Sequence, residues 1–201
     1  MCRLSDHRDQ DVQWSVDDEF GRQVAVVVST SLPNEPSGTL HFQMSEPGGT
    51  PMLSITRFAE RQHRLEIRDS AGGVIGQIRQ TSTRGQAFRK ARMAVVLESR
   101  RQPLACADLT IDPSQNRYAN LETPIRGAAG AVIATIERQG GYTGRGDDPF
   151  VYELRCAQPT GEPLPMLLLV TAFMHSLYDG VVDRGPFGAV GRWLSRPTWE
   201  S

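Results

Sequence analysis

The stretch that decides the fold is Ile67-Arg-Asp-Ser-Ala-Gly-Gly-Val-Ile-Gly-Gln-Ile-Arg-Gln80, which returns as Ile125-Arg-Gly-Ala-Ala-Gly-Ala-Val-Ile-Ala-Thr-Ile-Glu-Arg138. The two copies are offset by 125 − 67 = 58 positions and align without a gap. A looser copy at 44–57 carries one extra residue after its Gly pair. Each copy predicts a strand, a turn that uses glycine, and a second strand. An internal repeat of this kind predicts a fold built from repeated β-hairpins.

Short β-branched or alternating segments follow one another closely around the repeat. In Leu65-Glu-Ile67 and Val74-Ile-Gly-Gln-Ile78 one face is apolar, as in antiparallel strands with one side buried. We expect strands at 24–29, 40–44, 52–57, 64–69, 74–79, 88–98, 104–111, 118–126, 131–138 and 150–156. Residues 1–20 are acidic and polar, so we expect a flexible N-terminal arm with one edge strand at most.

After the strands the pattern changes once, to a single apolar helix. Leu164-Pro-Met-Leu-Leu-Leu-Val-Thr-Ala-Phe-Met174 is almost entirely apolar, and Pro165 and Gly180 suit the two ends of a helix. These eleven residues span about 16 Å, whereas a bilayer core measures about 30 Å. We therefore expect a core helix at about 164–180, with a transmembrane span as the alternative. A helix that is apolar on all sides suits the interior of a large barrel, which strand side chains alone cannot fill.

The order of hairpin, repeat and terminal helix resembles the tubby C-terminal-like superfamily, which includes the phospholipid scramblases and the LURP-one-related proteins. The resemblance is carried by Leu65 to Arg79, its second copy and the apolar helix, and it spans about 24–183. It implies a mainly β (α+β) fold, a closed antiparallel β-barrel of about twelve strands around a buried C-terminal helix. The expected organisation is an arm at 1–20, a barrel domain at 21–183 and a tail at 184–201.

The resemblance also implies functions that are mostly non-enzymatic, because tubby proteins bind phosphoinositides and scramblases are associated with calcium-dependent lipid movement. Scramblases carry an acidic calcium segment just before the last helix. Here that segment is Gln158-Pro-Thr-Gly-Glu-Pro-Leu-Pro165, with one carboxylate. Because calcium takes several oxygen ligands, we expect neither a calcium site nor another cofactor, and we rank lipid scrambling below lipid binding.

Composition and motifs narrow the function classes further. A net charge of −1 over 201 residues argues against a dedicated nucleic-acid binder. The three cysteines form neither a disulfide framework nor a zinc pattern, and acidic residues at 6, 9 and 11 leave no secretory signal, so a cytoplasmic protein is expected. Cys2 is expected to be an ordinary thiol, with an N-terminal nucleophile or a lipid-modified site as the alternative. The acidic runs at 17–19 and 147–148 show no metal-ligand spacing.

No catalytic motif occurs, and we expect no catalytic residue. His175 and Asp179 lie one helical turn apart and would form a hydrogen-bonded pair. A catalytic role would need a nucleophile nearby, and Cys156 and Ser176 are the only guesses. We expect instead a helix end that leaves the core with its polar groups satisfied.

Basic residues gather on the strand expected at 88–98 and just before it. Arginine binds phosphate in a bidentate manner, and each such charge near a membrane surface contributes about 1 kcal/mol. Alternation places Lys90 and Arg92 on one face of the strand and Arg89 on the other. The predicted site for an anionic headgroup or phosphate consists of Arg79, Arg84, Arg89, Lys90 and Arg92. The alternative is a solvated strand face balanced by neighbouring carboxylates.

The tail combines aromatic residues with arginines. Trp193 and Trp199, with Arg192 and Arg196, suit contact with a membrane interface or with a partner chain. The expected function is a non-enzymatic scramblase-like or LURP-one-related module that binds anionic lipid headgroups or another phosphate-bearing ligand, in the cytoplasm or peripherally at a membrane. The alternative is a cytosolic protein-interaction or structural scaffold protein.

Overall fold

A computed structural model describes residues 1–7, 13–30, 39–58, 62–83, 92–110, 121–139 and 151–182, which form twelve strands and one helix. The strands are β1 (Cys2–His7), β2 (Gln13–Asp18), β3 (Gln23–Ser29), β4 (Leu40–Ser45), β5 (Pro51–Phe58), β6 (Arg64–Asp69), β7 (Val74–Gln80), β8 (Arg92–Ser99), β9 (Gln102–Thr110), β10 (Leu121–Gly127), β11 (Val132–Gln139) and β12 (Val151–Cys156). The helix is α2 (Leu164–Val182).

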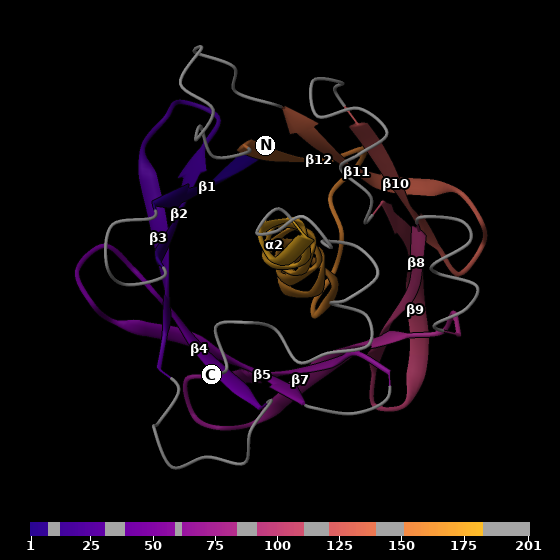
Figure 1. Cartoon of the computed structure of the whole chain (residues 1–201), viewed down its shortest axis with the longest axis horizontal. Coiled ribbons are helices and arrows are strands. Elements are labelled where there is room, and N and C mark those ends of the chain that lie inside the picture. The colour runs from indigo at the N-terminus through magenta and orange to yellow at the C-terminus, as the bar shows by residue number, and fades with distance from the viewer. Residues whose placement is uncertain are drawn as a thin grey trace.

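Each strand pairs antiparallel with its neighbours in the chain, and β1 pairs with both β2 and β12, so that the sheet closes into a barrel. Helix α2 lies inside the ring of strands (Figure 1). The prediction of a mainly β chain with one C-terminal helix is confirmed, and each of the ten expected strands overlaps a strand of the structure. No helix in the described part of the chain is long and apolar enough to cross a membrane.

The prediction of a flexible arm at 1–20 is wrong for the residues that the structure describes. β1 and β2 are barrel strands, and β1 supplies the pairing with β12 that closes the ring. Trp14 and Val16 point into the barrel and are 2% and 1% exposed. The acidic residues suggested an unpacked segment. In the structure Asp17, Asp18 and Glu19 lie where β2 ends and its turn begins, outside the core.

The repeat in the sequence corresponds to one hairpin turn that the barrel uses four times. In the turns β2–β3, β4–β5, β6–β7 and β10–β11, a backbone N–H donates to the carbonyl four residues later, at 2.9 Å. Each turn contains a glycine with φ between 76° and 86°, and these are Gly21, Gly49, Gly72 and Gly130. A register shift precedes each turn. This is the three-residue hairpin with a bulge glycine, in which a side chain at positive φ would be strained.

The two close copies share side-chain contacts as well. Arg68 and Arg126 occupy the same place in the two copies, and each donates from Nη1 to a glycine carbonyl across its turn, at 3.0 and 3.2 Å. Four of the six isoleucines in the two copies, Ile67, Ile78, Ile125 and Ile136, are fully buried in the barrel. The repeated residues therefore form the wall of the barrel and its hairpin turns.

The turn β8–β9 differs in length and backbone conformation from the four turns described above. Ser99 pairs with Gln102, and the two residues between them, Arg100 and Arg101, have φ of 50° and 64°. Positive φ at both central positions is the type I′ combination, which strongly prefers Asn-Gly. A residue other than glycine in this conformation costs on the order of 1 to 3 kcal/mol. Two arginines are therefore held in a backbone conformation that favours other residues.

We predict that the double substitution Arg100→Asn/Arg101→Gly stabilises the protein by about 1 to 2 kcal/mol, because it relieves this strain. The free energy of unfolding from urea titration measures the gain. Arg100→Ala/Arg101→Ala is the matched control, since it removes the same charges without supplying residues that tolerate positive φ. Equal stability of the two variants would show that the native turn is unstrained.

Helix α2 is packed on every side by the barrel wall. The ring of Phe173 makes edge-on contacts with Trp14 of β2 and Phe42 of β4, with centroids 4.9 and 5.1 Å apart. On the β7 side, Gly76 admits the helix, since a Cβ there would lie 3.1 Å from Leu167 Cδ2 and would collide with the Glu98 carbonyl. The helix thus supplies the centre of one continuous core.

Candidate functional site

Two of the five predicted anion-binding residues are described, and both lie on the outer wall of the barrel. Arg79 is near the end of β7, and Arg92 is the first residue of β8. Arg84, Arg89 and Lys90 lie outside the described residues, as do Trp193, Trp199, Arg192 and Arg196 of the tail. Of the residues predicted for this site, the structure therefore describes the surroundings of Arg79 and Arg92.

Arg79 is already held by a carboxylate. Its Nη2 donates to Glu98 Oε1 at 2.6 Å, and Gln77 Nε2 donates to the other oxygen, Oε2, at 2.7 Å. The strand register explains this arrangement, because Gln77 is opposite Glu98 and Arg79 lies one step diagonally from it. The hydrogen bond from Arg79 is the main cause that lowers the pKa of Glu98, against the opposing effect of burial. The structure therefore favours a role for Arg79 in pairing with Glu98 between neighbouring strands over a role in binding a ligand.

Arg92 has a different environment. It is exposed, pairs by register with Thr110 of β9, and forms no ion pair with any described side chain. Asp108, two residues before Thr110, is exposed on the same outer face. On β7, β8 and β9 the wall around the two arginines thus carries the carboxylates Glu98 and Asp108, and on β6 Arg64 lies opposite Arg79 and Glu66 lies opposite Gln77. Among the predicted residues that the structure describes, Arg92 is the one whose guanidinium is open to an external anion.

We expect Arg79→Gln to lower the free energy of unfolding by about 0.5 to 1 kcal/mol at pH 7, a modest value because the guanidinium is 42% exposed and partly screened. A carboxylate with a lowered folded-state pKa stabilises the fold above its unfolded pKa of about 4.3, and this stabilisation is lost as the pH falls through the folded value. The difference between wild type and variant should therefore shrink in acid.

Urea titrations at neutral and acidic pH measure this difference. Arg92→Gln is the control, for which we expect a change below about 0.5 kcal/mol at either pH. A difference for Arg79→Gln that stays constant down to strongly acidic pH would contradict the role given to Glu98.

The polar groups of α2 serve packing. His175 is fully buried, and its Nε2 donates to the Thr110 carbonyl at 3.0 Å. Ser176 Oγ accepts a hydrogen bond from Trp14 Nε1 at 3.2 Å. The expected pairing of His175 with Asp179 falls on a side chain outside the described part of the chain. Neither His175 nor Ser176 is therefore presented to solvent as a catalytic group would need to be.

The three cysteines are free thiols in different settings. Cys2 is a residue of β1 that packs against the core, and burial raises its pKa to about 11. A protonated, half-buried thiol is a poor nucleophile at neutral pH, so this environment disfavours the alternative of an N-terminal nucleophile. Cys106 and Cys156 are exposed. Within the described ranges, no group of three or more His, Cys, Asp or Glu side chains could hold a metal ion.

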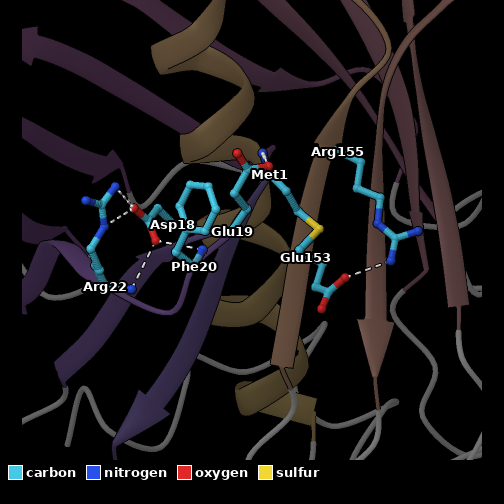
Figure 2. Close-up of polar contacts among 7 residues, drawn as sticks. All are labelled: Met1, Asp18, Glu19, Phe20, Arg22, Glu153 and Arg155. Carbon is cyan, nitrogen blue, oxygen red and sulfur yellow. Dashed lines mark hydrogen bonds and ion pairs between the residues drawn. The ribbon is translucent and has the colours of Figure 1, made fainter.

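An ion-pair cluster that no sequence pattern indicated lies on the outer wall of β11 and β12. Arg155 contacts Glu137 at 2.7 Å and Glu153 at 2.9 Å, and the contact with Glu153 is drawn in Figure 2. Glu137 and Glu153 lie opposite each other, and Arg155 offsets the repulsion between them. These carboxylates are sixteen positions apart, so only the strand register reveals that they meet.

A second missed feature is the end of the barrel formed by the turns β2–β3, β4–β5, β6–β7, β8–β9 and β10–β11, which we call the turn end. The large hydrophobic side chains that are exposed in the described chain all lie there: Met1 (44%), Phe20 (76%), Val24 (42%), Val74 (58%) and Val132 (39%). Val74 and Val132 occupy equivalent positions of the two repeat copies, directly after their turns. This shared position, an apolar residue directly after each turn, is the sequence pattern that could have indicated the exposed apolar side chains.

Comparisons with known proteins add little to this geometry. No protein-family model matches the chain, and no curated protein matches it. Among solved structures, the chain is similar to the X-ray structure of the Arabidopsis thaliana protein AT5G01750, with a TM-score of 0.48 and 11% sequence identity. The match covers 88% of this chain and 90% of the Arabidopsis chain.

Proposed function

We propose that this chain is a non-enzymatic binding module of the scramblase-like or LURP-one-related type, which contacts anionic headgroups at a membrane surface through the outer wall of β8 and the segment before it. One observation carries the proposal. The interior of the barrel is packed with α2, so groups that bind a ligand must lie on the outside, and Arg92 is exposed there without an ion-pair partner among the described residues.

The family assignment is supported by features inside the chain. The hairpin Leu65 to Arg79, its second copy and a buried C-terminal helix are the features on which the resemblance rests. All three occur as expected, with the helix inside a ring of strands (Figure 1).

Local charge supports the headgroup contact. Between Arg79 and Arg92 the chain carries five basic residues and no Asp or Glu. Glu98 neutralises Arg79, which leaves the four charges of Arg84, Arg89, Lys90 and Arg92 close together in the sequence. At about 1 kcal/mol per charge, four such residues suffice for reversible attachment to an anionic membrane. We propose a cytoplasmic protein that associates peripherally with membranes.

Vesicles that contain phosphatidylserine or a phosphoinositide test the proposal in a flotation assay at low salt. We expect binding to these vesicles and none to neutral phosphatidylcholine vesicles. Arg92→Gln should weaken partitioning by roughly fivefold, the equivalent of about 1 kcal/mol. Substitution of all four residues by Gln should abolish it.

Arg22→Gln is the matched control, because it removes the same charge from an exposed turn on the opposite side of the ring. Competition by soluble inositol phosphate or inorganic phosphate distinguishes a site for the free phosphate group from a site that needs a membrane. Equal flotation of wild type and the fourfold variant would refute the proposal.

A protein-interaction function is the second candidate. The observation that favours it is the set of exposed apolar side chains gathered at the turn end, since such patches commonly mark interaction surfaces. Lipid scrambling ranks below both candidates, because Glu162 is the one carboxylate in the segment where scramblases carry several.

A further inference from the structure

Charges of opposite sign occupy opposite halves of the turn end. The turns β8–β9 and β10–β11 present Arg100, Arg101 and Arg126 and contain no carboxylate. The turns β2–β3 and β4–β5 present three carboxylates, Asp18, Glu19 and Glu46. Two cations lie in this half, Arg22, which pairs with Asp18 at 2.7 Å, and the amino group of Met1, so Glu46 is the carboxylate with no ion pair among the described residues.

The acidic half also carries exposed apolar surface, part of which is drawn in Figure 2. Phe20 directly follows Asp18 and Glu19 in turn β2–β3, and Met1 lies close by, with its amino group 4.0 Å from Glu19 Oε2 (Figure 2). Asp18 accepts hydrogen bonds from the backbone N–H groups of Phe20 and Arg22, which fixes the turn that presents the ring. A phenylalanine held in this way and 76% exposed is suited to contact with another surface.

The order of the strands relates the two halves by a simple operation. Seen from turn β6–β7, turn β4–β5 lies two strands to one side and turn β8–β9 two strands to the other. Turns β2–β3 and β10–β11 lie four strands away on either side. When two identical ends face each other across a twofold axis in the plane between them, each position meets its mirror position. With the axis over turn β6–β7, every acidic turn meets a basic turn.

We propose that two copies of this chain pack turn end against turn end about this axis. Glu46 then faces Arg100 and Arg101 of the second copy, and the β2–β3 turn with Phe20 faces the β10–β11 turn with Arg126 and Val132. Val74 and Met1 lie near the axis and meet their own counterparts. The exposed apolar side chains thus become paired beside contacts between opposite charges, as in an isologous interface. This inference rests on the second candidate function and names its partner.

A second copy suits this end better than an unrelated partner for a physical reason. A partner with one sign of charge would be attracted by one half of the end and repelled by the other, whereas the same end turned over is complementary in both halves. The turn β8–β9 supports a role for its charges, since it has two arginines at positions where Asn-Gly would be less strained.

Sedimentation velocity on the full chain, from about 1 to about 200 μM, tests the dimer. The wild type should pass from monomer to dimer over this range, and the dimer should weaken in about 1 M salt, where the screening length falls to about 3 Å. Arg100→Asn/Arg101→Gly should raise the dissociation constant at least tenfold while the fold becomes more stable. Loss of the dimer in a better-folded variant cannot arise from misfolding.

A charge swap makes the test specific. Arg100→Glu/Arg101→Glu and Glu46→Arg should each be monomeric alone, and their mixture should form a heterodimer, because both symmetry-related contacts regain opposite charges. Glu122→Arg, the matched control on the outer wall of β10 away from the turn end, should dimerise like the wild type. A wild type that stays monomeric, charge variants that dimerise normally, or a mixture that fails to associate would overturn the inference. Flotation of Arg92 variants reports on another surface, so the headgroup proposal stands or falls separately.

Discussion

The barrel depends on the packing of α2 against its inner wall. Twelve strands enclose more space than their own side chains fill, and an unfilled interior would leave those side chains without contact partners. The helix meets this requirement with a mostly apolar run from Leu167 through Leu177, in which every residue except Leu169 is buried. Phe173 joins Trp14 and Phe42 into one aromatic cluster, so strands from the beginning of the chain are packed around a helix from near its end.

This constraint also determines where function can lie. Inward-facing positions are committed to the helix, and even the polar groups His175 and Ser176 satisfy hydrogen bonds with the wall. What remains is the outer wall and the ends. On the outer wall Arg92 of β8 is exposed, and the turn end carries exposed apolar side chains and charges of both signs. Headgroup binding and self-association would therefore use separate surfaces of one rigid body.

Local patterns predicted most of the fold. Alternation located the strands from β3 to β12, and the length of the apolar run located α2, because both signals reside in neighbouring residues. The arm prediction failed at β1 and β2, where the decisive contact is the pairing of β1 with β12 about 150 positions away. Polar residues such as Arg3 and Asp17 dominate these strands, so the apolar alternation that marks the other strands is weak in this part of the sequence.

The candidate site was less predictable than the fold. The basic character around Arg92 was visible in the sequence, but the commitment of Arg79 to Glu98 depends on the register between β7 and β8. The exposure of Val74 and Val132 depends on their position just beyond the end of the packed interior, where the alternation of the strand continues but the core does not. Both facts follow from three-dimensional placement, which single-sequence patterns do not encode.

The central claim is that α2 is the core around which the barrel closes. Native-state hydrogen exchange across α2 tests this claim most directly. The account predicts that the amide protons from Leu167 to Leu177 exchange only through global unfolding, with the same free energy as the most protected strand amides. Exchange of the helix at a clearly lower free energy, while the strands stay protected, would show that the barrel persists without its helix and would contradict the account.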